Sequence, residues 1–183
     1  MAILVVGGSG KHVGKTTLVC GLIAALVEFR WTAVKVTDHD HGKPDPVWEE
    51  TAAGPETDTA RYLEAGACRA LLVAKKNGRI PLRALRKTTG PGAHLILESN
   101  SILSQLRQDL ALAVLAPDAN VPGKPSFSAF LRRADAMVVR AGAAPSRSRL
   151  HAVAPLFELE HFARISPPML AWLRMKLQVA PHR

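Results

Sequence analysis

Short apolar runs of strand length alternate with segments of helical spacing along the whole chain. The predicted strands cover residues 2–7, 32–37, 69–74, 93–98, 110–116 and 136–140, with a weaker one at 153–159. The predicted helices cover residues 15–29, 57–65, 81–87, 102–107, 126–133 and 166–177. Strands that alternate with helices predict an α/β fold with three layers, in which helices flank both faces of a mostly parallel sheet.

The chain of 183 residues has no internal repeat and no clear linker, so we expect a single domain over residues 1–183. The segment 38–54 is rich in acids, prolines and glycines and has little periodicity, which predicts a long functional loop. No apolar stretch reaches the ~18 residues that a membrane span needs. The N-terminus also lacks the basic region of a signal peptide. We therefore expect a cytoplasmic protein with no membrane partner.

The formal net charge is +9, and such a basic surface attracts nucleotides, nucleic acids or acidic proteins. No basic run is interleaved with aromatic residues, which make up only 5% of the chain, so specific nucleic-acid binding is not expected. The two cysteines, Cys20 and Cys68, do not form a CxxC pair. They therefore indicate no disulfide framework or zinc site, and we interpret both as small buried apolar residues.

A glycine-rich segment lies between the first predicted strand and the first predicted helix. Counted back from Gly14, the strict Walker A spacing requires glycine at position 9, but the chain has Ser9 there. The glycine lies one residue earlier, at Gly8, so this loop is one residue longer than the strict motif. Its position between a buried strand and a helix is typical of a phosphate-binding loop (P-loop). The predicted nucleotide-binding residues are Gly8, Ser9, Gly10, Lys11, His12, Val13, Gly14, Lys15, Thr16 and Thr17.

The residue types of this loop suit a nucleoside triphosphate with Mg²⁺. Glycines let backbone N–H groups turn toward an anion, and the positive end of the following helix faces the phosphates. Lys15 supplies a positive charge to the β- and γ-phosphates, and the Thr16 hydroxyl is a ligand for Mg²⁺. Thr17 is expected to bind the α-phosphate. Lys11 and His12 are expected to face the triphosphate, a partner or solvent.

Carboxylates at the ends of predicted strands are candidates to hold the metal. Glu98 closes the apolar strand HLILE, where a charge is costly without a partner, so we predict a Walker B-type role, directly or through a metal-bound water. A capping acid for the next helix is the alternative. The segment Asp38-His39-Asp40-His41 suits a transition metal through its imidazoles, or places Asp38 or Asp40 near Mg²⁺, which we prefer. The predicted catalytic residues are Lys15, Asp40 and Glu98.

Three stretches together resemble the molybdopterin-guanine dinucleotide biosynthesis adapter family (MobB). They are GGSGKHVGKTTLVCGLIAAL, AVKVTDHDHG and ETDTARYLEAGACRALLVA, and the resemblance covers about residues 2–75. It implies a P-loop fold that forms a homodimer, binds and weakly hydrolyses GTP, and assists a cofactor-biosynthesis enzyme. It further implies that Gly14, Lys15, Thr16 and Thr17 bind phosphate, with Asp40 and Glu98 on the metal side. The chain departs from the family in its longer loop and in Ser99, where the family has glycine.

The longer loop is also similar to that of dethiobiotin synthetase, which keeps a second class of function open. Three hypotheses follow: an accessory NTPase, an ATP-dependent small-molecule kinase or ligase, and a non-catalytic nucleotide-binding module. The bound nucleotide is GTP or ATP. The Asn-Lys-x-Asp motif that reads guanine is missing after the strand 136–140, where the chain has RAGA, so base choice would fall to backbone atoms of residues 141–146.

Overall fold

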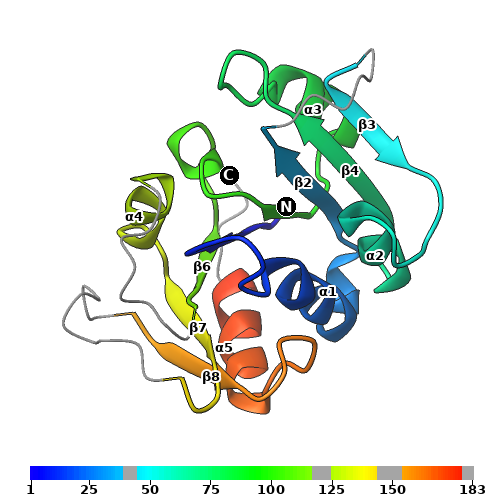
Figure 1. Ribbon diagram of the computed structural model, residues 1–183. Coiled ribbons are helices and arrows are strands. Elements are labelled where there is room, and N and C mark those ends of the chain that lie inside the picture. Colours follow the sequence, from blue (N-terminus) through cyan, green and yellow to red (C-terminus); the bar gives the residue numbers. More distant parts are fainter. Residues whose placement is uncertain (39–44, 117–124, 144–153, 179–183) are drawn as a thin grey trace.

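The computed structural model describes residues 1–38, 45–116, 125–143 and 154–178, and its centre is one eight-stranded sheet (Figure 1). The strands are β1 (Ile3–Gly8), β2 (Thr32–Thr37), β3 (Val47–Glu50), β4 (Arg69–Ala74), β5 (Leu95–Glu98), β6 (Leu110–Val114), β7 (Ala136–Arg140) and β8 (Leu156–Leu159). Their order is β3-β4-β2-β5-β1-β6-β7-β8. Only the β3–β4 pair is antiparallel among the strand pairs of the described residues, which confirms the predicted mostly parallel sheet.

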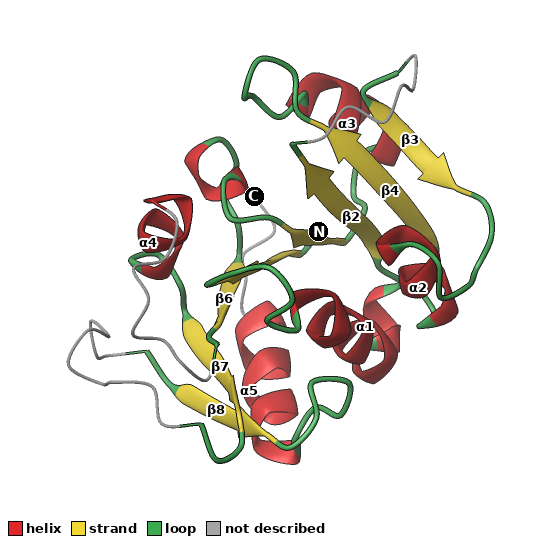
Figure 2. Ribbon diagram, in the orientation of Figure 1, coloured by secondary structure: helices red, strands yellow, loops and turns green. Residues whose placement is uncertain are grey.

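Helices cover both faces of this sheet, and Figure 2 shows the resulting layers. The α-helices are α1 (Lys15–Ala25), α2 (Asp58–Glu64), α3 (Leu82–Thr89), α4 (Pro125–Leu131) and α5 (Pro167–Gln178). One apolar core joins the sheet to α1, α2 and α5, and the other joins it to α3 and α4. Along β1 the side chains alternate between these cores: Leu4 and Val6 belong to the first, and Ile3 and Val5 to the second. Burial on both faces explains the unbroken apolar run of this strand.

The predicted loop over residues 38–54 contains a strand, which is a correction to the sequence analysis. β3 pairs with the edge of β4, and the Arg69 guanidinium of β4 holds the Glu49 carboxylate of β3 through two hydrogen bonds of 2.7 Å. All four residues of β3 are only partly buried, so the strand lacks the apolar alternation that would have revealed it.

Two predicted helices are shorter in the structure. The first ends at Ala25 and is followed by a 3-10 turn at Val27–Phe29, after which Arg30 adopts a positive φ of 49°. The helix predicted over 102–107 is a 3-10 turn at Ile102–Ser104. Cys20 is partly buried, but Cys68 is exposed, so the interpretation of Cys68 as a buried residue was wrong.

The parallel sheet brings chemically important segments to one edge. Parallel strands carry their carboxyl ends at the same edge, where ligands bind in open α/β sheets. In register, Glu98 of β5 lies beside Val6 of β1 and Lys35 of β2. The glycine-rich loop leaves β1 at this edge and leads into α1. Among the described residues, no helix is long and apolar enough to cross a membrane.

Candidate functional site

The start of the glycine-rich loop is held by a side-chain amide from the loop after β5. The backbone N–H of Gly8 donates to Asn100 Oδ1 at 2.8 Å, and Asn100 Nδ2 donates to the Gly8 carbonyl at 2.9 Å. Ser9 stands where the strict motif has glycine, and its hydroxyl accepts a hydrogen bond from the Ala116 backbone N–H at 2.8 Å. Ser9 therefore links the loop to the segment just after β6, and a glycine at this position would have no hydroxyl to accept this bond.

Gly14 closes the loop as the N-cap of α1 and has a left-handed φ of 97°. Glycine adopts this conformation without steric cost. The ring of Phe162, from the segment between β8 and α5, covers the residue so closely that a Cβ on Gly14 would lie 2.2 Å from its Cδ2. The first turn of α1 carries no acidic residue that would offset the positive end of the helix dipole.

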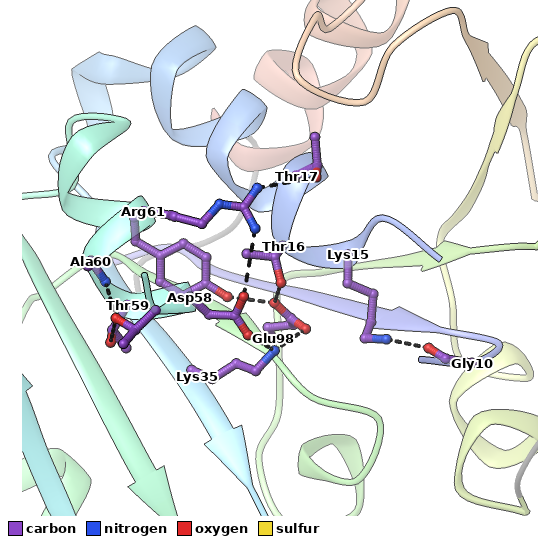
Figure 3. A network of polar contacts seen from close by, with 12 residues as sticks. Gly10, Lys15, Thr16, Thr17, Lys35, Asp58, Thr59, Ala60, Arg61 and Glu98 are labelled. Atoms are coloured by element: carbon purple, nitrogen blue, oxygen red, sulfur yellow. Dashed lines mark hydrogen bonds and ion pairs between the residues drawn. The ribbon is translucent and has the colours of Figure 1, made fainter. Parts of the chain in front are cut away.

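The loop carries three basic side chains, which differ in exposure. Lys15 is partly buried, and its Nζ donates to the Gly10 carbonyl at 2.6 Å, so its charge lies across the loop (Figure 3). Lys11 and His12 are exposed, and His12 has a positive φ of 58°. Of these three, Lys15 is the cation that the loop itself encloses.

Glu98 is a buried carboxylate, only 3% exposed, at the end of β5. Its Oε2 accepts hydrogen bonds from the Thr16 hydroxyl at 2.8 Å and from Tyr62 Oη at 2.6 Å. Its Oε1 accepts from Lys35 Nζ at 2.5 Å. The carboxylate thus joins the start of α1 to α2 and β2 (Figure 3). These partners compensate the cost of burying its charge.

Lys35 links this carboxylate to a second one on α2. Its Nζ lies 2.7 Å from Asp58 Oδ2, and Arg61 approaches the same carboxylate at 3.8 Å. Burial would lower the pKa of Lys35, but the Glu98 carboxylate and the hydrogen bond to Asp58 raise it above its ordinary value. Burial would raise the pKa of Asp58, but the hydrogen bond and charge of Lys35 lower it. Both groups are therefore charged at neutral pH.

Tyr62 supplies a hydroxyl that stays protonated. The side chain is fully buried, and burial, followed by the charge and hydrogen bond of Glu98, raises its pKa well above 10.0. At neutral pH the phenol is a permanent donor to Glu98. Tyr62 and Thr16 together fill the two lone-pair positions of Glu98 Oε2.

A pocket of about 340 Å³ adjoins the other side of the loop. Thr17 and Gly14 form its boundary with the glycine-rich loop. Arg140, at the end of β7, and His161 give it polar walls. The remaining lining residues are His12, Val13, Leu115 and Phe162. Its walls come from the ends of β6 and β7 and from the segment before α5, at the same edge of the sheet as the loop.

The predicted site residues are thus only partly brought together. Thr16 and Glu98 are in direct contact. The side chain of Asp38 is 76% exposed and forms an ion pair of 2.7 Å with Lys75. Asp40, His39 and His41 lie outside the described residues, so their proposed contacts with a metal stay predictions. Within the described ranges, no three His, Cys, Asp or Glu side chains lie together as a group that could hold a metal ion.

Sequence reasoning missed Lys35, Asp58, Tyr62 and Asn100. A lysine inside the otherwise apolar strand AVKV was a usable signal, because a charge in such a strand needs a partner. Asp58 opens α2 behind the N-cap Thr57, where an acid has an ordinary structural explanation. Neither Tyr62 nor Asn100 carries a local signal in the sequence, since each acts on a segment that is distant along the chain.

Similar solved structures of known proteins include HypB and a MobB protein homolog. HypB from Helicobacter pylori, in complex with nickel, matches with a TM-score of 0.58 at 17% identity over 97% of this chain and 86% of that one. A MobB protein homolog from Bacillus stearothermophilus matches with a TM-score of 0.53 at 19% identity over 97% of this chain and 99% of that one. No family model and no curated protein matches the chain. The chain therefore shares its fold with HypB and with the MobB homolog.

Proposed function

We propose that this chain binds a nucleoside triphosphate with Mg²⁺ and hydrolyses it slowly. The observation that carries the proposal is the contact between the Thr16 hydroxyl, at the start of α1, and the buried carboxylate of Glu98. A hydroxyl that donates to a carboxylate keeps its lone pairs for a metal ion, and Mg²⁺ prefers such oxygen ligands. Thr16 and Glu98 would hold the ion, which would supply positive charge to neutralise the phosphates.

The loop and its lysine would bind the phosphates. The backbone between Gly8 and Lys15 turns over the positive end of α1, and Asn100 and Phe162 fix the two ends of this turn. Lys15 Nζ donates to the Gly10 carbonyl, and we propose that this ammonium would donate to a phosphate when a triphosphate is bound. Asp40 remains our candidate to orient the attacking water.

The nucleoside would occupy the pocket next to Thr17. This pocket of about 340 Å³ begins where the α-phosphate would end and has mixed polar and apolar walls. The Arg140 guanidinium offers a flat cation that stacks on either purine. This arrangement accepts GTP or ATP, and the described walls favour neither base.

We further propose that the protein forms a homodimer and acts as an accessory NTPase that serves a cofactor-biosynthesis enzyme. The support is the fold shared with the MobB homolog, together with the three sequence stretches that resemble that family. By that resemblance, the enzyme it serves would make molybdopterin guanine dinucleotide. An ATP-dependent kinase or ligase of the dethiobiotin synthetase type is the second candidate, favoured by the longer loop.

Phosphate release from GTP and from ATP, with and without Mg²⁺, tests the hydrolysis. We expect Mg²⁺-dependent turnover of roughly 10⁻⁴ to 10⁻² s⁻¹, as in GTPases that lack an activator. Glu98→Gln should lower it at least about tenfold, because the neutral amide no longer supports the metal. Glu64→Gln, at an exposed position of α2, is the matched control and should leave it unchanged. Full Mg²⁺-dependent turnover in Glu98→Gln would contradict the metal assignment.

A further inference from the structure

We propose that Lys35 acts as a built-in counter-cation that makes binding of a divalent metal depend on bound triphosphate. This inference rests on the proposed function and concerns the regulation of the same site. Lys35 Nζ lies between the two carboxylates, 2.5 Å from Glu98 Oε1 and 2.7 Å from Asp58 Oδ2. Its side chain is only 21% exposed, so water screens this charge weakly.

Lys35 occupies the one oxygen of Glu98 that still has room for a ligand. A carboxylate oxygen accepts at two lone pairs, and Oε2 already receives the hydroxyls of Thr16 and Tyr62. Oε1 receives only Lys35 among its hydrogen-bond donors in the described part of the chain. A metal ion that bound Glu98 directly would therefore have to approach the same oxygen as the ammonium.

Lys35 and Arg61 leave the group with little net negative charge to attract a bare divalent cation. Glu98 and Asp58 contribute two negative charges and Lys35 one positive charge, which leaves one negative charge for the three side chains. Arg61, 3.8 Å from Asp58, weakens even that charge. Mg²⁺ gives up its water reluctantly and usually binds through carboxylates together with substrate phosphates. A triphosphate brings oxygen ligands and negative charge of its own, and so supplies the ligands and the charge that the three side chains lack.

Lys35 can keep its ion pair with Asp58 when a metal ion takes its position on Glu98. Asp58 Oδ2 lies at hydrogen-bond distance from Nζ, and a lysine ammonium has three donors on a flexible stem. The ammonium can leave Glu98 for a phosphate oxygen while it keeps Asp58. The same side chain would then oppose the metal without nucleotide and support the metal–nucleotide complex.

Binding of Mn²⁺ to nucleotide-free protein, followed by electron paramagnetic resonance at about pH 8, tests this inference. Lys35→Gln removes the charge and keeps a donor for the carboxylates, whereas Lys35→Arg keeps the charge. We expect Lys35→Gln to bind Mn²⁺ at least about tenfold more tightly than the wild type, in competition with Mg²⁺. Lys35→Arg should bind it no more tightly than the wild type.

The double variant Lys35→Gln/Asp58→Asn restores the net charge of the group and should return the affinity toward that of the wild type. Circular dichroism melting confirms that each variant is folded, and Lys35→Met replaces Lys35→Gln if the latter does not fold. Mn²⁺ affinity at or below the wild-type value in the folded, charge-free variant would overturn the inference. Because this titration contains no nucleotide, its result is independent of whether a triphosphate binds.

Discussion

Phe162 covers Gly14 at the end of the glycine-rich loop. A Cβ at Gly14 would lie 2.2 Å from Cδ2 of the ring, and Phe162 itself is 8% exposed within the core shared with α1 and α5. The segment that precedes α5, far along the chain, therefore sets the position of the loop at the start of α1. A side chain at position 14 would clash with this ring, and the ring cannot move away without disturbing the packing of the core.

Gly14→Ala should destabilise the protein and weaken triphosphate binding. The matched control is Gly66→Ala, because Gly66 has nearly the same φ of 99° but nothing within 4 Å of its added Cβ. The control measures the cost of the backbone conformation alone, about 1 kcal/mol. Gly14→Ala should cost about 1–3 kcal/mol more, in urea unfolding, because the methyl group overpacks the contact with Phe162. Equal losses in the two variants would contradict the contact.

Asn100→Asp should weaken triphosphate binding more than it weakens the fold. The carboxylate keeps the acceptor for the Gly8 N–H, but it loses the donor to the Gly8 carbonyl and adds a negative charge beside the loop. Gln105→Glu is the matched control, since Gln105 Oε1 accepts from the Ile80 N–H away from the loop. Calorimetric titration with triphosphate should show at least about a tenfold loss for Asn100→Asp only. A similar effect of both variants would indicate a general effect of charge.

The two cysteines should differ strongly in reactivity. Burial, opposed by the charge of Arg61 and reinforced by nearby carboxylates, raises the pKa of Cys20 from 9.0 to about 11, whereas Cys68 is exposed. Alkylation by iodoacetamide at about pH 8, read by mass spectrometry, should label Cys68 first, because only the thiolate reacts. Cys20 should become reactive in urea. Equal labelling of both sites in the folded protein would show that the surroundings of Cys20 differ from those described.

Tyr62→Phe should cost about 1.5–3 kcal/mol of unfolding free energy, because it removes a hydrogen bond to a charged group and leaves Glu98 with fewer donors. The raised pKa of Tyr62 means that the folded state keeps a proton that the unfolded state releases above about pH 10. This contribution to stability is complete below about pH 10 and is lost as the pH rises further. Unfolding at pH 7 and pH 11 should therefore show a smaller difference between variant and wild type at the higher pH.

The parts that were predictable from the sequence are those with local causes. The unbroken apolar run of β1, the glycines after it and the helical spacing after Lys15 each follow from neighbouring residues. Glu98 was recognisable because a charge that closes an apolar strand requires a partner. Ser9 was noticed only as a departure from the motif, and its bond to Ala116 required the folded chain.

The missed parts depend on contacts between distant segments. Lys35 is 63 residues from Glu98 along the chain, and Tyr62 is 36 residues from it, so only the strand order brings them together. β3 was missed because its pairing depends on Arg69 and on the edge of β4, and its own residues are only partly buried. Asp38 and Asp40 remain predictions about a segment whose central part lies outside the described residues.

The most direct test of the account is the change in melting temperature that a triphosphate causes in the presence of Mg²⁺. GTP or ATP, at about 100 times its Kd, should raise the melting temperature of the wild type by roughly 5–10 °C. Lys15→Ala should abolish this rise, because the loop loses the cation that it encloses, while Lys87→Ala, at an exposed position of α3, should keep it. If neither triphosphate raises the melting temperature at millimolar concentration, the proposed binding is wrong.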